Sequence, residues 1–103
     1  MRVLVLFDLP MVTNEEKRQY TKFRKYLLDD GFSMLQFSIY MRFCRNAVDA
    51  QKHANRVATL CPLTGNIRVL SITEKQYEDM YLIVGEKSPT EIYVNKDYTM
   101  VIE

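Results

Sequence analysis

The sequence predicts a single α+β domain, and three observations support this fold class. The chain has 103 residues, which is the length of one ordinary domain. Hydrophobic residues make up 48% of the chain and charged residues 26%, a balance typical of a globular protein with a buried core. Short apolar runs with strand character alternate with two longer segments of helical periodicity. The elements follow one another as strand, helix, strand, helix, strand and strand.

The first strand and the first helix are expected at residues 2–9 and from about residue 14 to residue 30. The centre of the strand is apolar without alternation, which indicates burial on both faces, and Pro10 ends its ladder. Thr13 and Glu16 fit a capping box at the start of the helix. The helix has two opposite faces, one apolar with Tyr20, Phe23 and Leu27 and one basic with Arg18, Lys22 and Lys25.

The following stretch, residues 35–43, alternates between apolar and polar side chains and contains no Gly or Pro. We therefore expect one long half-buried strand, with or without a bulge, followed by a short extended segment. If residues 32–43 form two strands instead, the chain fits a ferredoxin-like βαββαβ unit. The alternation places Leu35, Phe37, Ile39, Met41 and Phe43 on one side, and Gln36, Ser38, Tyr40 and Arg42 on the other.

The second half of the chain is expected to contain a helix at residues 46–61 and strands at 67–73 and 81–84. The tail, residues 86–103, has strand-like segments but little core of its own, so it should join a sheet edge of this chain or of a partner. We therefore divide the chain into a domain at 1–85 and a C-terminal strand tail at 86–103. The buried stripe of the second helix is expected to contain Ala47, Ala50, Ala54, Val57, Ala58 and Cys61.

The apolar first strand also predicts a homodimer. Residues 3–7 are apolar on both sides, and two helices can cover one face of a small sheet. The other face then needs a second sheet, most simply from an identical protomer. The alternative is that the tail folds back over this face.

Asp8 is the main candidate for chemistry. It ends the first strand and, by alternation, lies on the same face as Leu4 and Leu6, which is the expected dimer face. A two-fold axis nearby would bring two carboxylates together, and such a pair repels unless a proton or a cation such as Mg²⁺ lies between them. A shared Mg²⁺ could activate water or stabilise a phosphoryl transition state. The simpler interpretation is that Asp8 caps the following turn.

Basic side chains are the second candidate feature. The net charge is only +1, so a nucleic-acid partner would be held by a local patch. By itself a run of basic residues on a helix more often means a solvated face with i,i+4 pairs, but Asp29 is the one acidic partner that the spacing offers to the basic face of the first helix, which modestly raises the case for binding. A dimer would present two copies of this face to a duplex backbone. The basic residues are Lys17, Arg18, Lys22, Arg24 and Lys25 on the first helix, and Arg42 and Arg45 after the long strand.

Other features predict less. Cys44 and Cys61 lack metal-binding spacing and are expected to be free thiols, and His53 is expected on the surface. The apolar run at 3–7 is stopped by Asp8, far short of a membrane span, and no secretory signal pattern is visible. We therefore expect a cytoplasmic protein with no membrane partner.

Several short segments together resemble a known family. These are residues 6–10 (LFDLP), 22–27 (KFRKYL), 31–32 (GF) and 36–42 (QFSIYMR). In this order and spacing they resemble the small CRISPR-associated adaptation protein, the non-integrase subunit of the spacer-acquisition complex, which is often named a CRISPR-associated endoribonuclease. The resemblance covers nearly the whole chain and is strongest to members from type II systems.

The resemblance implies a ferredoxin-like βαββαβ fold, a homodimer, and a tail strand that pairs with the sister subunit and helps dock the integrase. It implies that Asp8 is the metal-binding residue at the dimer interface, with Mg²⁺ as the cofactor. It also implies that the dimer bridges two integrase dimers and contacts the backbone of a prespacer duplex. By position, the candidate DNA contacts are Lys17, Arg18, Lys22, Lys25, Arg42 and Arg45.

Two departures from the family pattern argue against intrinsic nuclease activity. Phe7 stands where many members carry Tyr, and Met34 stands where some carry an arginine. We therefore favour a non-catalytic scaffold over a metal-dependent endonuclease that cleaves RNA or DNA through paired Asp8. A third hypothesis is an antitoxin-linked ribonuclease or a regulatory ligand-binding domain, since the same fold hosts both.

Overall fold

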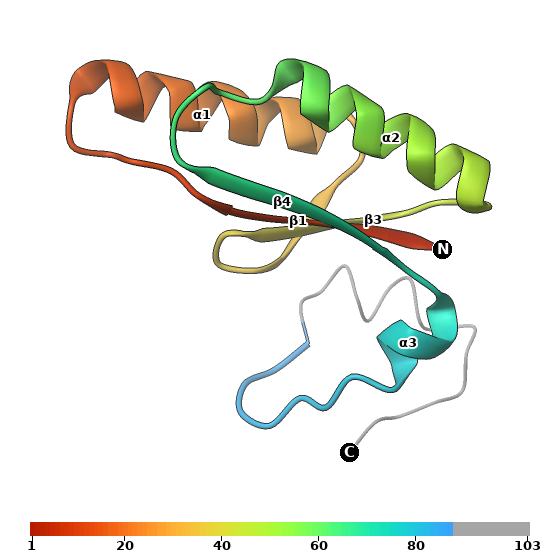
Figure 1. The fold of residues 1–103 in the computed structure, drawn as a ribbon. Coiled ribbons are helices and arrows are strands. Elements are labelled where there is room, and N and C mark those ends of the chain that lie inside the picture. Colours follow the sequence, from red (N-terminus) through yellow and green to blue (C-terminus); the bar gives the residue numbers. More distant parts are fainter. Residues whose placement is uncertain (88–103) are drawn as a thin grey trace.

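A computed structural model describes residues 1–87 and confirms the α+β fold class (Figure 1). The first six elements follow the ferredoxin-like order βαββαβ, and a short helix comes after them. The strands form one antiparallel sheet in the order β2-β3-β1-β4. The elements are β1 (Arg2–Asp8), α1 (Asn14–Asp29), β2 (Ser33–Gln36), β3 (Ile39–Phe43), α2 (Ala47–Leu60), β4 (Asn66–Ile72) and α3 (Glu74–Glu78).

Helices α1 and α2 cover one face of the sheet, as Figure 1 shows. Both begin at the capping residues that their sequences indicate: Thr13 and Glu16 form a capping box at α1, and the Asn46 side chain accepts from the backbone N–H of Asp49 at α2. Gly31 follows α1 with a φ of +93°, a conformation that glycine adopts without strain.

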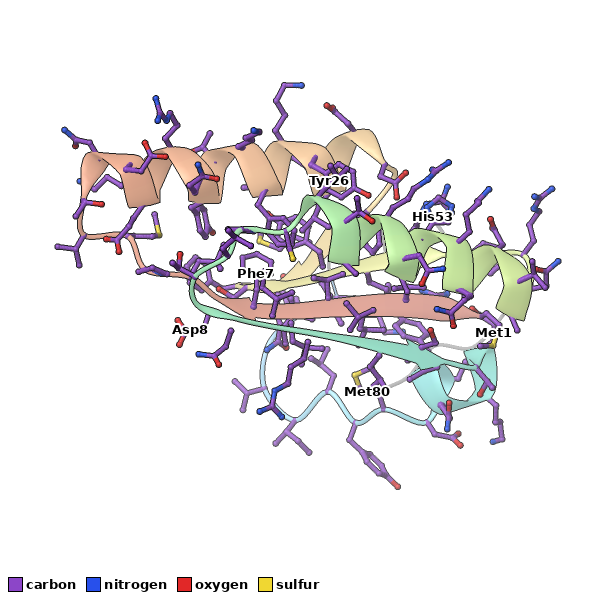
Figure 2. The ribbon with its side chains drawn as sticks, turned by 45° about the horizontal axis from the view of Figure 1, so that its top comes forward. Met1, Phe7, Asp8, Tyr26, His53 and Met80 are labelled. Atoms are coloured by element: carbon purple, nitrogen blue, oxygen red, sulfur yellow. The ribbon has the colours of Figure 1, made fainter. Side chains whose placement is uncertain are left out.

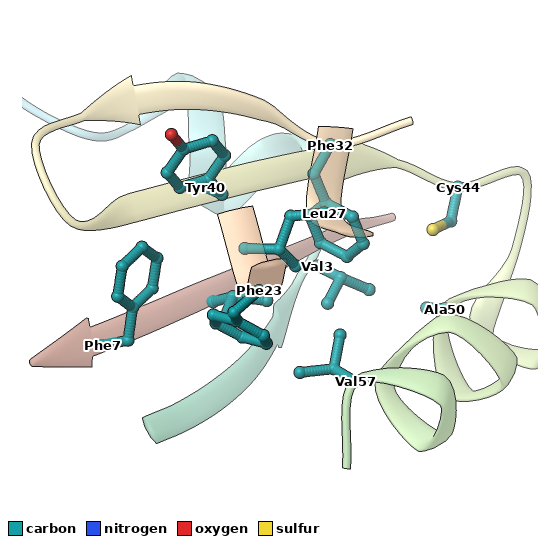
Figure 3. Close-up of a cluster of buried hydrophobic side chains, with 10 residues drawn as sticks. Val3, Phe7, Phe23, Leu27, Phe32, Tyr40, Cys44, Ala50 and Val57 are labelled. Carbon is teal, nitrogen blue, oxygen red and sulfur yellow. The ribbon is translucent and has the colours of Figure 1, made fainter. Parts of the chain in front are cut away.

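The core beneath these helices is built around β1 (Figure 3). Val3 and Val5 are fully buried, and Phe7 is nearly so. The ring centroid of Phe7 lies 5.4 Å from that of Phe23 and 5.7 Å from that of Tyr40, so three elements meet on one side chain. The remaining buried members of this core are Leu27, Phe32, Cys44, Ala50 and Val57.

A second, smaller core lies on the opposite face of the sheet. Leu4 of β1 and Met41 of β3 pack there against Tyr77 of α3. The prediction that β1 is buried on both faces is therefore confirmed, and α3 supplies part of the cover for the second face. The buried guanidinium of Arg2 fixes this arrangement: its Nε and Nη2 donate to the carboxylate of Glu74 at 2.9–3.1 Å, and its Cζ lies 3.7 Å from the centroid of the Tyr77 ring.

The prediction of one long strand at residues 35–43 is wrong. The segment is a hairpin of β2 and β3, with a turn at Phe37 and Ser38. Ser38 adopts a φ of +65° without being glycine, and its carbonyl accepts a hydrogen bond from the Phe7 N–H at 3.1 Å. The turn leaves Phe37 76% exposed, whereas Tyr40, expected on the polar side, is 1% exposed in the main core.

The predicted strand at residues 81–84 is also wrong in the described part of the chain. These residues follow α3, form no ladder and remain exposed. Helix α3 itself was not predicted from the sequence. A local signal for α3 exists, because Thr73 and Gln76 form a capping box. The predicted strand tail at 86–103 lies almost wholly outside the described residues.

No helix within residues 1–87 is long and apolar enough to cross a membrane.

The contact of Arg2 with Glu74 gives a test of how α3 is held. We expect Glu74→Gln to lower the free energy of unfolding by about 1–2 kcal/mol, because a charge-assisted hydrogen bond to a buried guanidinium becomes a neutral one. Urea unfolding followed by circular dichroism measures the change. Glu78→Gln in the same helix is the control and should stay within about 0.5 kcal/mol of the wild type. Equal losses in both variants would contradict this role of Arg2.

Candidate functional site

Asp8 ends β1 at the edge of the second face, where the sequence predicted it. It pairs with Asn66 of β4, and the strand alternation places its side chain on the face of Leu4 and Leu6. The residue is exposed. Among residues 1–87 its carboxylate has no hydrogen bond or ion pair, so the alternative role as a turn cap finds no support in this part of the chain.

A shallow hollow adjoins Asp8. Asn66 and Arg68 of β4 line it, together with Phe37 and Ser38 of the hairpin turn. No group of three or more His, Cys, Asp or Glu side chains within residues 1–87 could hold a metal ion. A single carboxylate is a weak site by itself, but Mg²⁺ can use one or two carboxylates and keep several waters.

The basic residues of α1 are exposed on its outer surface, as expected. Lys17 and Lys22 make no ion pair among the described residues. Lys25 pairs with Asp29 at 2.7 Å, and Arg18 pairs with Glu15. The expectation that Asp29 is the one acidic partner of this face was therefore wrong, since Glu15 is a second, one turn before Arg18. The residual positive charge of α1 comes from Lys17, Lys22 and Arg24, whose Nε donates to the neutral Tyr40 hydroxyl at 2.8 Å.

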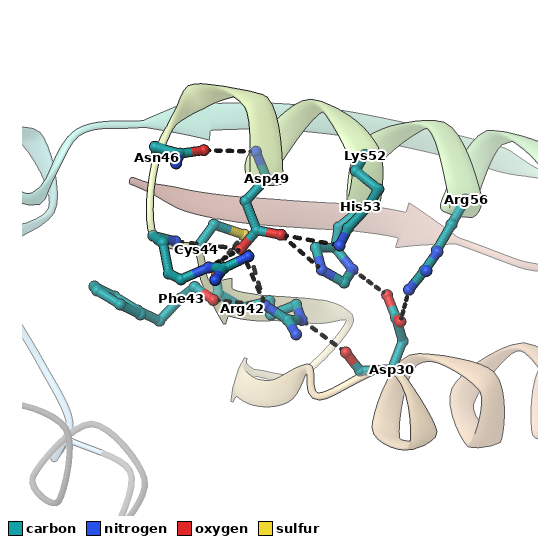
Figure 4. Close-up of polar contacts among 10 residues, drawn as sticks. Asp30, Arg42, Phe43, Cys44, Asn46, Asp49, Lys52, His53 and Arg56 are labelled. Atoms are coloured by element: carbon teal, nitrogen blue, oxygen red, sulfur yellow. Dashed lines mark hydrogen bonds and ion pairs between the residues drawn. The ribbon is translucent and has the colours of Figure 1, made fainter.

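Arg42 and Arg45 do not join the α1 residues. Arg42 is half-buried at the end of β3, where its Nε donates to the Asp30 carbonyl at 2.7 Å. Arg45 is 81% exposed just before α2 and approaches Asp49 at 3.9 Å. The six predicted DNA contacts are thus divided between the outer surface of α1 and a polar cluster between α1, β3 and α2 (Figure 4).

His53 is the centre of this polar cluster, and its expected surface position was wrong. The ring is 3% exposed; its Nδ1 lies 2.7 Å from Oδ2 of Asp30, and its Nε2 lies 3.4 Å from Oδ1 of Asp49 (Figure 4). Because carboxylate oxygens only accept, a ring N–H donates to Asp30. Asp30 follows α1 and Asp49 lies in the first turn of α2, so the imidazole joins the end of one helix to the start of the other. This cluster and Asp8 lie at opposite ends of the sheet (Figure 2).

Asp49 is a shared carboxylate. The backbone N–H of Arg45 donates to it at 3.2 Å, and the Lys52 ammonium lies 3.3 Å away. These contacts hold the pKa of Asp49 below its usual value, with the Arg45 N–H as the main cause, Lys52 and His53 adding to it, and burial acting against them. Asp49 is therefore ionised at neutral pH.

The two family departures lie in different environments. Phe7 belongs to the main core, and it also borders the hollow next to Asp8. Met34 is 47% exposed on the edge strand β2.

Cys44 is buried, which raises the pKa of its thiol and disfavours a reactive thiolate, and Cys61 is a half-buried free thiol.

Two further basic residues lie near this cluster, Lys52 and Arg56, and neither was predicted as a site residue from the sequence. Arg56 donates to Asp30 at 3.0 Å. A signal was present: Asp49, Lys52 and Arg56 follow Arg45 at steps of four, three and four residues, the spacing of one helix face.

The fold and the position of Asp8 define a class: small ferredoxin-like proteins with an acidic residue at the end of the first strand. The model of the CRISPR associated protein Cas2 family matches residues 1–80. The chain belongs to this family, which confirms the resemblance inferred from its sequence.

Curated relatives support the same family, and a solved structure has the same fold. The CRISPR-associated endoribonuclease Cas2 of Acidovorax ebreus is 49% identical over 85 residues, 82% of this chain and 83% of the relative. The protein of the same name from Lacticaseibacillus rhamnosus is 39% identical over 102 residues, 99% of this chain and 100% of the relative. The crystal structure of Streptococcus pyogenes Cas2 at pH 6.5 covers 82% of this chain and 100% of that chain, with a TM-score of 0.60 and 18% identity, and shows the shared fold.

The lowered pKa of Asp49 predicts a pH dependence of stability. A carboxylate whose folded pKa is depressed stabilises the fold above its unfolded pKa of about 4, and this contribution is lost as the pH falls through the folded pKa. We expect Asp49→Asn to be less stable than the wild type above about pH 5, with a difference that shrinks below about pH 4. Urea unfolding from pH 3 to 7 measures it.

The matched control is Asp79→Asn, which removes the exposed partner of Lys75 and should change stability little at any pH. A difference between wild type and Asp49→Asn that stays constant over the pH range would refute the assignment.

Proposed function

We propose that the protein is a CRISPR adaptation protein that acts as a homodimer, bridges integrase dimers and binds the backbone of a prespacer duplex. Membership of the Cas2 family supports a role in CRISPR adaptation. The main support for the proposed dimer is the incomplete cover on the second face of the sheet. Helix α3 covers only part of it, and the chain continues from α3 into an exposed apolar segment.

The proposed dimer surface consists of the edge strand β4 and residues 80–84. Strand β4 has seven residues and pairs with β1 on one side, so its other edge has no ladder partner among residues 1–87. Leu70 of β4 lies on the second face of the sheet, and 53% of its surface is exposed. Such an edge readily pairs with a further strand, and an exposed apolar run next to it favours burial against another chain. The exposed side chains of residues 80–84 are Met80, Tyr81, Leu82, Ile83 and Val84.

The proposed duplex contacts lie on the helix layer, away from that surface. Lys17 and Lys22 make no ion pair at contact distance among the described residues, so they are available to phosphates. A dimer would carry two copies of this surface and could follow a backbone over a longer span. Docking of the integrase is assigned to the tail by the family resemblance, and the tail lies outside the described residues.

A second candidate function is a metal-dependent endonuclease. Relatives that are 39–49% identical bear the name CRISPR-associated endoribonuclease. The specific observation that favours it is Asp8, an exposed carboxylate on the proposed dimer face with no protein partner among residues 1–87. Two such carboxylates could hold Mg²⁺, which would activate water for attack on a phosphodiester.

The dimer surface can be tested by adding charge to it. We expect Leu82→Asp with Ile83→Asp to convert a dimer into a monomer at micromolar concentration, because both side chains are exposed in the single chain and would be buried between two. Sedimentation velocity measures the mass. Val48→Asp on α2, whose side chain is 80% exposed, is the matched control and should leave the dimer intact. A wild type that is monomeric at all concentrations would overturn the proposal.

Asp8→Asn separates the scaffold from the nuclease. In a spacer-integration assay with the cognate integrase, the scaffold proposal expects wild-type integration from this variant, because amide and carboxylate have the same shape. Cleavage of RNA and DNA with and without Mg²⁺ is measured on the same preparations. Failure of integration by a variant that is still dimeric would contradict the scaffold proposal, and Mg²⁺-dependent cleavage that disappears with Asp8 would establish the nuclease.

A further inference from the structure

Helix α2 presents a row of cations that is separate from the basic surface of α1. Lys52 and Arg56 lie on one side of the helix, Arg45 just before its start continues their line with Asp49 between Arg45 and Lys52, and we call the three cations the α2 row. Their side chains are 81%, 52% and 51% exposed. The row borders the groove between the end of α1 and the start of α2, which Arg42 and His53 also line.

The groove has more cations than anions. Asp49 lies 3.3 Å from Lys52, 3.9 Å from Arg45 and 4.0 Å from Arg42, so three cations share one carboxylate. Asp30 accepts from Arg56 at 3.0 Å and is also occupied by His53. With Asp29, which also lines the groove, four cations thus face three carboxylates, and the groove retains one positive charge with His53 counted as neutral.

On α1 the positive charge is distributed differently, because Lys17 and Lys22 make no ion pair within residues 1–87 while the other two cations of that surface are paired. There Arg18 has Glu15 and Lys25 has Asp29, each with a carboxylate of its own within one turn. Sharing leaves the α2 row less neutralised than these two pairs. The first turn of α2 is also at the positive end of the helix dipole, which adds to the attraction for an anion.

The α2 row is also held in place before any ligand arrives. His53 and Asp49 are buried beneath it, and the Asn46 side chain accepts the Asp49 N–H at 2.9 Å (Figure 4). Side chains that are already ordered lose less entropy on binding, so each contact contributes more to affinity.

We infer that the α2 row is a second contact surface for the phosphate backbone of nucleic acid, with Lys52 and Arg56 as the contacting residues and Asp30, His53 and Asp49 as positioning residues. Lys52 and Arg56 are one helical turn apart, about 6 Å along the axis, so they can meet neighbouring phosphates of one strand. This inference rests on the proposed function, because the duplex supplies the polyanion.

The test measures the salt dependence of binding to a labelled DNA duplex by fluorescence anisotropy, using the full chain. Each lost phosphate contact lowers the slope of log K against log salt by about 0.9. The double variant Lys52→Gln with Arg56→Gln should lower the slope by about two if one protomer contacts the duplex and about four if both do. The single variant Lys52→Gln should lower it by about half as much, and it leaves the contact of Arg56 with Asp30 intact.

Lys75→Gln is the matched control. Lys75 is an exposed helical lysine paired with an aspartate at 3.0 Å, as Lys52 is at 3.3 Å, but it lies on α3. Its replacement should leave the slope unchanged. A further variant, Arg56→Lys, keeps the charge and should retain the wild-type slope.

A variant of α1, with Lys17, Lys22 and Lys25 changed to Gln, distinguishes this inference from the proposed function. If this variant lowers the slope and the α2 variants do not, the inference is overturned while duplex binding stands. If the wild type binds no duplex at any salt concentration, the proposed DNA binding fails first. If the α2 variants bind the integrase more weakly with an unchanged slope, the row is a protein-docking surface and the inference is overturned.

Discussion

The burial of β1 on both faces is the constraint on which the rest of the structure depends. Its odd-numbered residues enter the core under α1 and α2, and its even-numbered residues enter the smaller core under α3. A central strand of this kind cannot remain in water on either side, so the fold must place cover on both. One face receives two long helices, and the other receives a five-residue helix. The incomplete cover on the second face is what makes a partner chain the natural complement.

Buried charge is used at two places to hold helices in position. Arg2 joins the start of β1 to α3 through Glu74, and His53 joins the end of α1 to the start of α2 through Asp30 and Asp49. In each case the buried group meets ionised or hydrogen-bonding partners, which offsets the cost of removing it from water. The contacts of Arg2 with Glu74 and of His53 with Asp30 connect residues far apart in the chain, so they fix tertiary geometry, whereas the contact of His53 with Asp49 lies within α2.

The distribution of charge relates the fold to the proposed functions. Asp8 is exposed at one end of the sheet, and the polar cluster around His53 lies at the other end (Figure 2). The cations of α1 and α2 belong to the helix layer, whereas the apolar surface of residues 80–84 follows α3 on the opposite side. A dimer formed through the sheet would leave both helix layers accessible to a nucleic acid. The two proposed surfaces are thus compatible within one assembly.

The sequence by itself determined the elements whose signals are local. The apolar run of β1 and the capping box of Thr13 with Glu16 each lie within a few residues, and each was predicted correctly. The predicted buried stripe of α2 was wrong in part: Ala50 and Val57 are buried, but Ala47 and Ala58 are exposed, and Asp49 and His53 are buried instead. The face of the sheet on which Asp8 lies also followed from alternation along one strand. Only the tertiary structure decided the β2–β3 turn, because Ser38 takes a positive φ while its carbonyl is bound by Phe7 of β1. It also decided that His53 is buried, since its partner Asp30 follows α1 and comes next to α2 only when the two helices pack together. A sequence pattern reports which side chains share a face, but the partner of that face is set by the packing of distant segments.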